Sequence, residues 1–282
     1  MALHGLLLHQ QLLLLLIISA VTAAFQLDPR CQSQMNCGSV KIPYPFGTSW
    51  GCYLDESFHI DCKNMSGIPK PVLANTNIEV LNISLDDGEL LVSIPLTRGC
   101  FNNVSSPSPT QSIWSKFPVS NRKNKFIAVG CDIFAYVTDS SGNYASACIS
   151  ICDSNSSVVE LEGRCFGEGC CEASIPKGLV VFNVGIEPRY GRKSHDNSCV
   201  LAFVVKKEED LQILRNKSTV PVVLDWTIAN KKCKDPRNLE GCACTANNSE
   251  CHNSANGPGC LCKCPSGFAG NAYIDEVCTG TS

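Results

Sequence analysis

Short apolar segments, each bounded by Gly, Pro, Asn or Ser, recur along the chain after residue 30. They are rich in β-branched and aromatic residues and fall within the usual strand length of about four to eight residues. The clearest lie at residues 90–94, 126–129, 179–184, 200–205 and 220–226. This pattern predicts a mainly β protein.

One segment, residues 206–216, has a helical pattern instead. Three acidic residues at 208–210 precede its apolar residues, and basic residues follow at 215 and 217. Acidic residues at the start and basic residues at the end suit the helix dipole. We therefore expect a helix of two or three turns packed on a sheet.

The N-terminal segment, residues 1–24, contains no charged residue and no cysteine. A Leu/Ile-rich core at residues 12–18 is followed by small residues at 21–24, as in a secretory signal peptide. The alternative is a retained membrane anchor, but this core is short for a span of about 20 residues. We expect cleavage after residue 24 and a mature chain without a transmembrane span.

Composition supports an oxidising compartment. The chain has 20 cysteines among 282 residues, an even number that allows every cysteine to be paired. The apolar content of 44% and net charge of -3 argue against a disordered chain. Lys and Arg (23) are fewer than Asp and Glu (26), so we expect no nucleic-acid partner.

The sequence has little that points to catalysis. Only His59, His195 and His252 follow the signal segment, and none has metal-ligand spacing or the context of a catalytic triad. No Gly-x-Ser-x-Gly motif is present. We expect a non-enzymatic protein without a cofactor.

Six Asn-x-Ser/Thr sequons suggest a glycosylated surface and predict that their asparagines face solvent. They are Asn64, Asn82, Asn103, Asn155, Asn216 and Asn247.

Two changes in composition divide the chain. Residues 102–111 form a polar stretch rich in Pro and Ser, which is typical of a linker or long loop. After Trp226 the apolar strands stop, and eight of the 20 cysteines follow between Cys233 and Cys278. So small a segment needs disulfides for much of its stability. We expect three modules, at residues 28–105, 106–228 and 229–282.

The C-terminal cysteines resemble those of an epidermal-growth-factor-like domain, with Cys-x-Cys repeats, the Gly-aromatic turn after Cys264 and a final cysteine. The resemblance implies first-third, second-fourth and fifth-sixth pairing, although spacing alone leaves 105 arrangements of eight cysteines open. The fit assigns Cys233–Cys251, Cys244–Cys262 and Cys264–Cys278, and leaves Cys242 and Cys260 for a fourth bridge.

Metal binding is the competing interpretation of these cysteines. Clustered Cys-x-Cys could hold zinc or copper as thiolates, but a secretory compartment favours disulfides. Calcium binding in such domains uses acidic residues before the first cysteine, and residues 230–232 are Asn-Lys-Lys. We expect no metal site.

The N-terminal module carries an unusual motif, Cys31-x5-Cys37-Gly38-x-Val40-x-Ile42-Pro43-Tyr44-Pro45-Phe46-Gly47, followed by Gly51-Cys52 and Phe58-His59-Ile60-Asp61-Cys62. It resembles the extracellular galacturonan-binding domain of plant wall-associated receptor kinases. Further matches are Ala128-Val129-Gly130-Cys131-Asp132, Cys148-x3-Cys152, Gly169-Cys170-Cys171-Glu172, Ile175-Pro176 and Cys199-x2-Ala202-Phe203. The resemblance covers nearly the whole mature chain. It implies a disulfide-rich, multi-module ectodomain at the cell wall.

The family continues into a transmembrane helix and a kinase, and this sequence shows neither the helix nor the kinase motifs. We therefore expect a secreted ectodomain-only relative or a truncated product of a longer receptor.

Three expectations concern single residues of these motifs. Pro43 and Pro45 fix the backbone and remove two donors, so residues 42–47 should form a turn or edge. Tyr44 and Phe46 could pack on the Cys37 bridge or stack on a ligand, and we favour packing. Adjacent Cys170 and Cys171 should anchor two different strands.

The expected function is non-catalytic binding of pectin or oligogalacturonides. Uronate carboxylates need cations, and the candidate ligand-binding residues are Lys41, Arg122, Lys123 and Lys125. A solvated basic loop is the alternative for any one cluster, and calcium bridges are another route to a polyanion. The rival function is a protein-interaction or decoy module that acts on receptor ectodomains.

Overall fold

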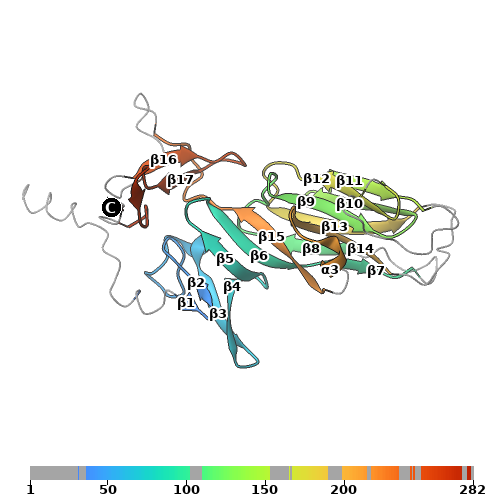
Figure 1. Cartoon of the computed structure of the whole chain (residues 1–282), viewed down its shortest axis with the longest axis horizontal. Coiled ribbons are helices and arrows are strands. Elements are labelled where there is room, and N and C mark those ends of the chain that lie inside the picture. The colour runs from blue at the N-terminus through green and yellow to red at the C-terminus, as the bar shows by residue number, and fades with distance from the viewer. Residues whose placement is uncertain are drawn as a thin grey trace, which may run out of the picture.

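The computed structural model describes residues 31, 36–101, 110–152, 165, 167–189, 199–214, 217–234, 242, 244, 249–274 and 278–280. The expected signal peptide lies outside these residues, as does most of the expected linker. Within the described ranges strands are the main secondary structure, and all the paired strands run antiparallel (Figure 1). This confirms the predicted mainly β, disulfide-rich class.

The first sheet has five strands in the order β15-β6-β5-β4-β3. They are β3 (Ile60–Met65), β4 (Ile68–Leu73), β5 (Glu79–Ser84), β6 (Glu89–Pro95) and β15 (Thr219–Asp225). Buried and exposed positions alternate along β6, so Leu90, Val92 and Ile94 face the core. A small hairpin of β1 (Asn36–Cys37) and β2 (Val40–Lys41) and a 3₁₀ turn, η1 (Glu56–Phe58), accompany this sheet.

Two four-stranded sheets pack face to face beside it (Figure 1). One contains β8 (Thr110–Trp114), β10 (Ile133–Asp139), β11 (Tyr144–Ser150) and β13 (Val181–Pro188). The other contains β7 (Thr97–Gly99), β9 (Asn124–Val129), β12 (Cys170–Ser174) and β14 (Val200–Lys206). All of β14 except Lys206 is buried, because one face meets the opposite sheet and β15 contacts the strand as well.

The strands do not follow the division expected at residue 105. β7, from the first range, pairs with β14, and β15, from the second range, pairs with β6 along its whole length. The N–H and C=O groups of β6 need hydrogen-bond partners on both edges of the strand. β5 pairs with one edge, and β15 pairs with the other, where no described strand of residues 28–105 does. The first two modules are therefore interlocked by shared sheets.

The five predicted strands correspond to β6, β9, β13, β14 and β15. The predicted helix at residues 206–216 is wrong in extent, because the described helix, α3, spans only Leu211–Leu214. Lys206 pairs with Asn124, and the Lys207 N–H donates to the Lys123 carbonyl oxygen, so β-pairing holds these residues extended. Asp210 Oδ1 accepts from the Gln212 N–H (2.9 Å) and starts the single remaining turn.

An aromatic core joins the three parts of the chain. The Trp226 side chain is fully buried, and its ring lies 5.4 Å from Phe46, 6.0 Å from Phe58 and 5.5 Å from Tyr273. Residues 42–47 form a turn with a cis Tyr44–Pro45 bond. Tyr44 and Phe46 are both buried in the core that also contains Cys37, so their role is packing, as predicted.

Ten disulfides pair all 20 cysteines. In the first two modules they are Cys31–Cys52, Cys37–Cys62, Cys100–Cys199, Cys131–Cys152, Cys148–Cys171 and Cys165–Cys170. Cys171 of β12 is tied to β11, whereas Cys170 closes a loop of only five residues rather than anchoring a second strand.

The C-terminal segment contains two short hairpins. β16 (Glu250–Asn253) pairs with β17 (Cys260–Lys263), and β18 (Phe268–Ala269) pairs with β19 (Thr279–Gly280). Its disulfides are Cys233–Cys251, Cys242–Cys260, Cys244–Cys262 and Cys264–Cys278. Three of these are the pairs that the growth-factor-like frame implies, and Cys242–Cys260 is the expected fourth bridge. Among the described residues, no helix has the length and apolar character needed to cross a membrane.

Candidate functional site

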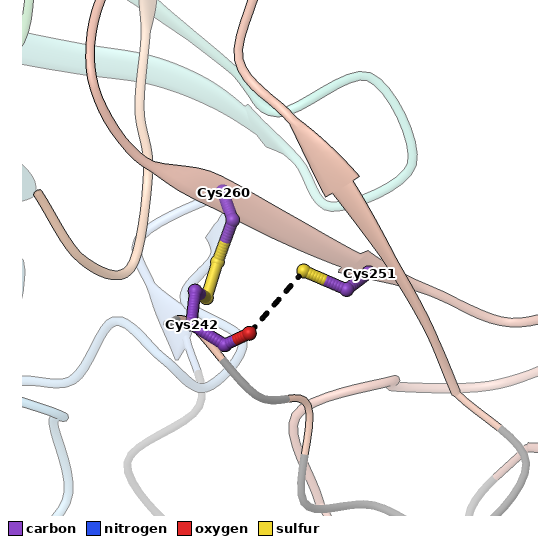
Figure 2. Close-up of side chains that lie close together, drawn as sticks. All are labelled: Cys242, Cys251 and Cys260. Atoms are coloured by element: carbon purple, nitrogen blue, oxygen red, sulfur yellow. Dashed lines mark hydrogen bonds between the residues drawn. A yellow bond between two sulfur atoms is a disulfide. The ribbon is translucent and has the colours of Figure 1, made fainter. Parts of the chain in front are cut away.

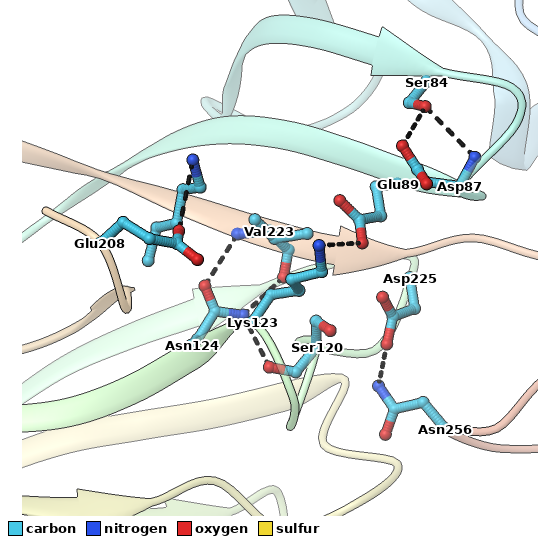
Figure 3. Close-up of polar contacts among 11 residues, drawn as sticks. Ser84, Asp87, Glu89, Ser120, Lys123, Asn124, Glu208, Val223, Asp225 and Asn256 are labelled. Atoms are coloured by element: carbon cyan, nitrogen blue, oxygen red, sulfur yellow. Dashed lines mark hydrogen bonds and ion pairs between the residues drawn. The ribbon is translucent and has the colours of Figure 1, made fainter.

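The four cations expected to bind ligand fall into two places. Lys41 is exposed on β2, whereas Arg122, Lys123 and Lys125 lie at the start of β9. Lys123 Nζ is 3.4 Å from Glu89 Oε1, and Lys125 Nζ is 3.0 Å from Glu172 Oε2 (Figure 3 shows the first pair). Among the described residues, Lys123 and Lys125 therefore each have a carboxylate partner, whereas no carboxylate lies within ion-pair distance of Lys41 or Arg122.

A second surface, which the sequence did not suggest, begins at an exposed aromatic group. The Trp50 side chain is 86% exposed, and its ring meets that of Tyr53 edge-on at 6.3 Å. The Tyr53 ring in turn stacks on the His59 ring, with centroids 4.7 Å apart and planes 21° apart. Trp50 therefore presents an apolar ring to solvent beside two further rings, which together form an exposed aromatic group on which a ligand can pack.

The loop that carries Trp50 is held firmly. The Gly47 N–H donates to the Phe58 carbonyl oxygen, and the Ile60 N–H donates to the Gly47 carbonyl oxygen, so the loop starts against β3. The Cys31–Cys52 disulfide closes its other end. A Cβ at Gly47 would lie 2.2 Å from the Cys52 carbonyl oxygen, so only glycine permits this close approach.

Charged residues continue the aromatic group along β3 and β4. Side chains alternate on a strand, so His59, Asp61 and Lys63 share one face. Lys63 lies directly opposite Lys70 of β4, which places two cations side by side. We call Trp50, Tyr53, His59, Asp61, Lys63 and Lys70 the aromatic–lysine strip.

Carboxylates set the electrostatics of the strip. His59 lies between Glu56 and Asp61, at 3.8 Å and 3.7 Å, and Lys63 Nζ is 3.9 Å from Asp61. Lys70 Nζ is 3.0 Å from Glu79. The Tyr53 hydroxyl donates to Glu56 Oε1 (2.8 Å), and this hydrogen bond raises the pKa of Tyr53. Such exposed ion pairs are weak, so the lysines are available to a ligand carboxylate.

On the other side of η1 lies a cleft of about 270 Å³. All three parts of the chain line it, including Asp55 and Ser57, Lys116 and Pro118, and Ile228 and Pro258. We call it the junction cleft. Lys116 Nζ donates to the Glu56 carbonyl oxygen (2.7 Å), which connects the cleft to the turn beneath the strip. Burial lowers the pKa of Lys116, although the nearby Glu56, Asp61 and Asp55 oppose this effect.

Asn256 fixes one wall of the junction cleft. Its side chain is 1% exposed, and Nδ2 donates to the Val119 carbonyl oxygen (2.9 Å) and to Asp225 Oδ2 (2.8 Å, Figure 3). Its Oδ1 accepts from the Gly178 N–H (3.1 Å). Burial raises the pKa of Asp225, and the Asn256 bond opposes that shift. These hydrogen bonds attach the C-terminal segment to Val119 and Gly178 of the middle part and to Asp225 of β15.

One group of sulfur atoms resembles a metal site. The sulfurs of Cys242, Cys251 and Cys260 lie within 4.8 Å of one another (Figure 2). However, Cys242 is bonded to Cys260 and Cys251 to Cys233, and metal ligation needs a free thiolate. The 3.7 Å contact from Cys251 Sγ to the Cys242 carbonyl oxygen involves a sulfur that has no proton to donate. The cluster is a disulfide core.

Two of the six sequon asparagines can be located. Asn64 on β3 and Asn82 on β5 are exposed. Asn103, Asn155, Asn216 and Asn247 lie outside the described residues. Glycosylation of Asn64 and Asn82 stays a prediction that their exposure permits.

The fold and these surfaces define a disulfide-stapled β protein in which an exposed aromatic group lies beside paired lysines and carboxylates. Comparison with known proteins identifies its family. Residues 31–94 match the family described as wall-associated receptor kinase galacturonan-binding, and residues 162–235 match the family described as wall-associated kinase.

The curated relatives agree with these matches. Wall-associated receptor kinase 2 of Arabidopsis thaliana is 36% identical over 92% of this chain and 36% of its own length. Wall-associated receptor kinases 5 and 1 of the same plant are 34% and 33% identical, over 92% and 90% of the chain and 36% and 35% of their own lengths. The chain therefore corresponds to the extracellular region of wall-associated receptor kinases and spans about a third of the length of these relatives. No solved structure matches it.

Proposed function

We propose that this chain binds pectic polysaccharide at the cell wall, without catalysis, through the aromatic–lysine strip. The main support for the proposal is the position of the strip in the sequence. Every residue of the strip, from Trp50 to Lys70, falls inside residues 31–94, the part that matches the galacturonan-binding family.

The strip has the two groups that a galacturonate polymer requires. The C–H face of a sugar ring is apolar and packs on an aromatic ring, as Trp50 and the Tyr53–His59 stack offer. A uronate carboxylate accepts charge-assisted hydrogen bonds from lysines such as Lys63 and Lys70. At about 3.3 Å per residue, roughly 13 Å separates His59 from Lys63 along β3, so the strip is long enough to contact more than one sugar.

Ten disulfides favour the oxidising space outside the cell, where pectin lies. Because lysine–carboxylate contacts on a surface are screened by salt, binding should weaken as ionic strength rises.

Replacing Trp50 by alanine should weaken retention on immobilised polygalacturonate at least about tenfold, since aromatic anchors commonly contribute more than about 1.4 kcal/mol. Trp50 is 86% exposed, so the fold should not change. Trp114→Ala is the matched control, because Trp114 is 68% exposed on the separate strand β8. Affinity electrophoresis in polygalacturonate measures both variants. Equal retention of Trp50→Ala and the wild type would place the site elsewhere.

A second pair of variants separates the strip from the cations that the sequence suggested. Lys63→Gln with Lys70→Gln should weaken retention several-fold and flatten its salt dependence, because two carboxylate contacts are lost. Charge reversal of Lys41, Arg122, Lys123 and Lys125 should have a smaller effect. The opposite order in the same electrophoresis would assign binding to the start of β9 and to β2. If neither set alters retention, the binding site lies elsewhere on the protein. If the wild type itself is not retained, the protein-interaction function is favoured.

A further inference from the structure

We propose that the junction cleft is a second ligand site, which takes a free hexuronic acid or the end residue of a short acidic oligosaccharide, with Lys116 as its carboxylate partner. This site is distinct from the strip, and its ligand is a small soluble sugar acid rather than the polymer.

The cleft is built before any ligand arrives. The three hydrogen bonds of buried Asn256 fix one wall. The Ile228 N–H donates to the Cys260 carbonyl oxygen (3.0 Å), and a Cβ at Gly259 would lie 2.3 Å from the Ala229 carbonyl oxygen. Segments 227–230 and 254–258 therefore pack closely where they line the cleft. A preformed site spares a ligand the cost of ordering these segments.

Lys116 supplies the charge. An ammonium group has three N–H donors, and the Glu56 carbonyl oxygen occupies one, so two can reach a ligand. Among the described residues that line the cleft, Asp55 is the only other charged one, and its Oδ1 already accepts from the Ser57 N–H (2.7 Å). Glu56 and Asp61 also act on Lys116 and help to keep its ammonium group charged. One cation in a partly desolvated cleft favours a single carboxylate over a polyanion.

The rest of the lining suits a sugar ring. Ser57, Thr227 and Ser254 bring hydroxyl groups for the hydroxyls of a sugar, and Pro118, Ile228 and Pro258 bring apolar surface for its C–H face. The volume of about 270 Å³ is below the range of about 300–1,000 Å³ typical of sites for drug-sized ligands. This size favours one sugar acid or a chain end over the interior of a polymer.

Calorimetric titration of the complete, disulfide-bonded protein with galacturonic acid tests the proposal, with galactose as the neutral control. We expect saturable binding of the acid and at least tenfold weaker binding of galactose, which lacks the carboxylate. Lys116→Met should lose at least tenfold in affinity. Lys217→Met should bind as the wild type does, because Lys217 is exposed at the far end of β15 from the cleft. Absence of saturable binding, or equal affinity for both sugars, would overturn the proposal.

A measurement on the wild-type protein tests the site even if Lys116→Met does not fold. Galacturonic acid should slow acetylation of the Lys116 amine several-fold, read by mass spectrometry, and leave acetylation of Lys217 unchanged. Equal rates at Lys116 with and without the acid would contradict the site. Retention on polygalacturonate is measured separately, so failure of the cleft and failure of the strip give different results.

Discussion

Replacement of Trp226 by alanine is expected to lower the free energy of unfolding by about 3–5 kcal/mol, the usual cost of truncating a buried aromatic residue. The side chain is fully buried and contacts Phe46, Phe58 and Tyr273. These rings come from the first and last parts of the chain, so the cavity would open where the modules meet. The same change should loosen the junction cleft.

Trp226→Phe is the matched control. It keeps an aromatic ring, and it removes the indole Nε1, which has no hydrogen-bond partner within the described part of the protein. We therefore expect it to cost less than half as much as alanine. Urea unfolding followed by circular dichroism, with all disulfides verified by mass spectrometry, measures both. A loss below about 1 kcal/mol for Trp226→Ala would show that this ring does not hold the modules together.

Asn124→Ala is expected to destabilise the protein by about 2–4 kcal/mol, because it leaves buried backbone groups unpaired. Asn124 is fully buried, and its Nδ2 donates to the Ser120 and Val223 carbonyl oxygens, each at 2.8 Å. Its Oδ1 accepts from the Val223 N–H at 2.9 Å (Figure 3). These bonds join β9 of one sheet to β15 of another.

The neighbouring Asn121 offers a control, because its Oδ1 is buried and has no hydrogen-bond partner among the described residues. Asn121→Ala should change the free energy of unfolding by less than about 1 kcal/mol. Thermal unfolding by calorimetry compares the two variants under identical conditions. Equal effects would mean that the bonds of Asn124 to β15 add no stability.

The strongest strands could be predicted from the sequence because their own residues carry the signal. The segments at 90–94, 200–205 and 220–226 are so apolar that they can be predicted as strands without knowing which strands they pair with. Pairing could not be predicted, since β15 reaches β6 across more than a hundred residues of chain. The extent of the helix expected at residues 206–216 was wrong for the same reason. Pairing with Asn124, which is distant in sequence, extends β14 to Lys206.

The candidate surfaces depend even more on tertiary contacts. Basic residues at positions 122, 123 and 125 stand out in the sequence, but Glu89 and Glu172, the partners of Lys123 and Lys125, are distant in it. Trp50 and His59 look unrelated until the Gly47 bridge brings their loop and β3 together. One sequence signal could have suggested the strip. Asp61 and Lys63 are two residues apart, and a hairpin turn at 66–67 would place Lys63 opposite Lys70.

The cysteines show the same limit. A family frame could suggest the four C-terminal pairs, and these are the pairs in the structure. The family resemblance implied no pairing for the other twelve cysteines. Pairs such as Cys100–Cys199, which are 99 residues apart, are set by the tertiary fold and could not be predicted.

The most direct test of the central claim is a titration of the intact, glycosylated protein with polygalacturonate at low salt, with and without calcium. The account predicts saturable binding that weakens as salt is added, and no binding of a neutral galactan. Absence of binding to polygalacturonate under both conditions would contradict it.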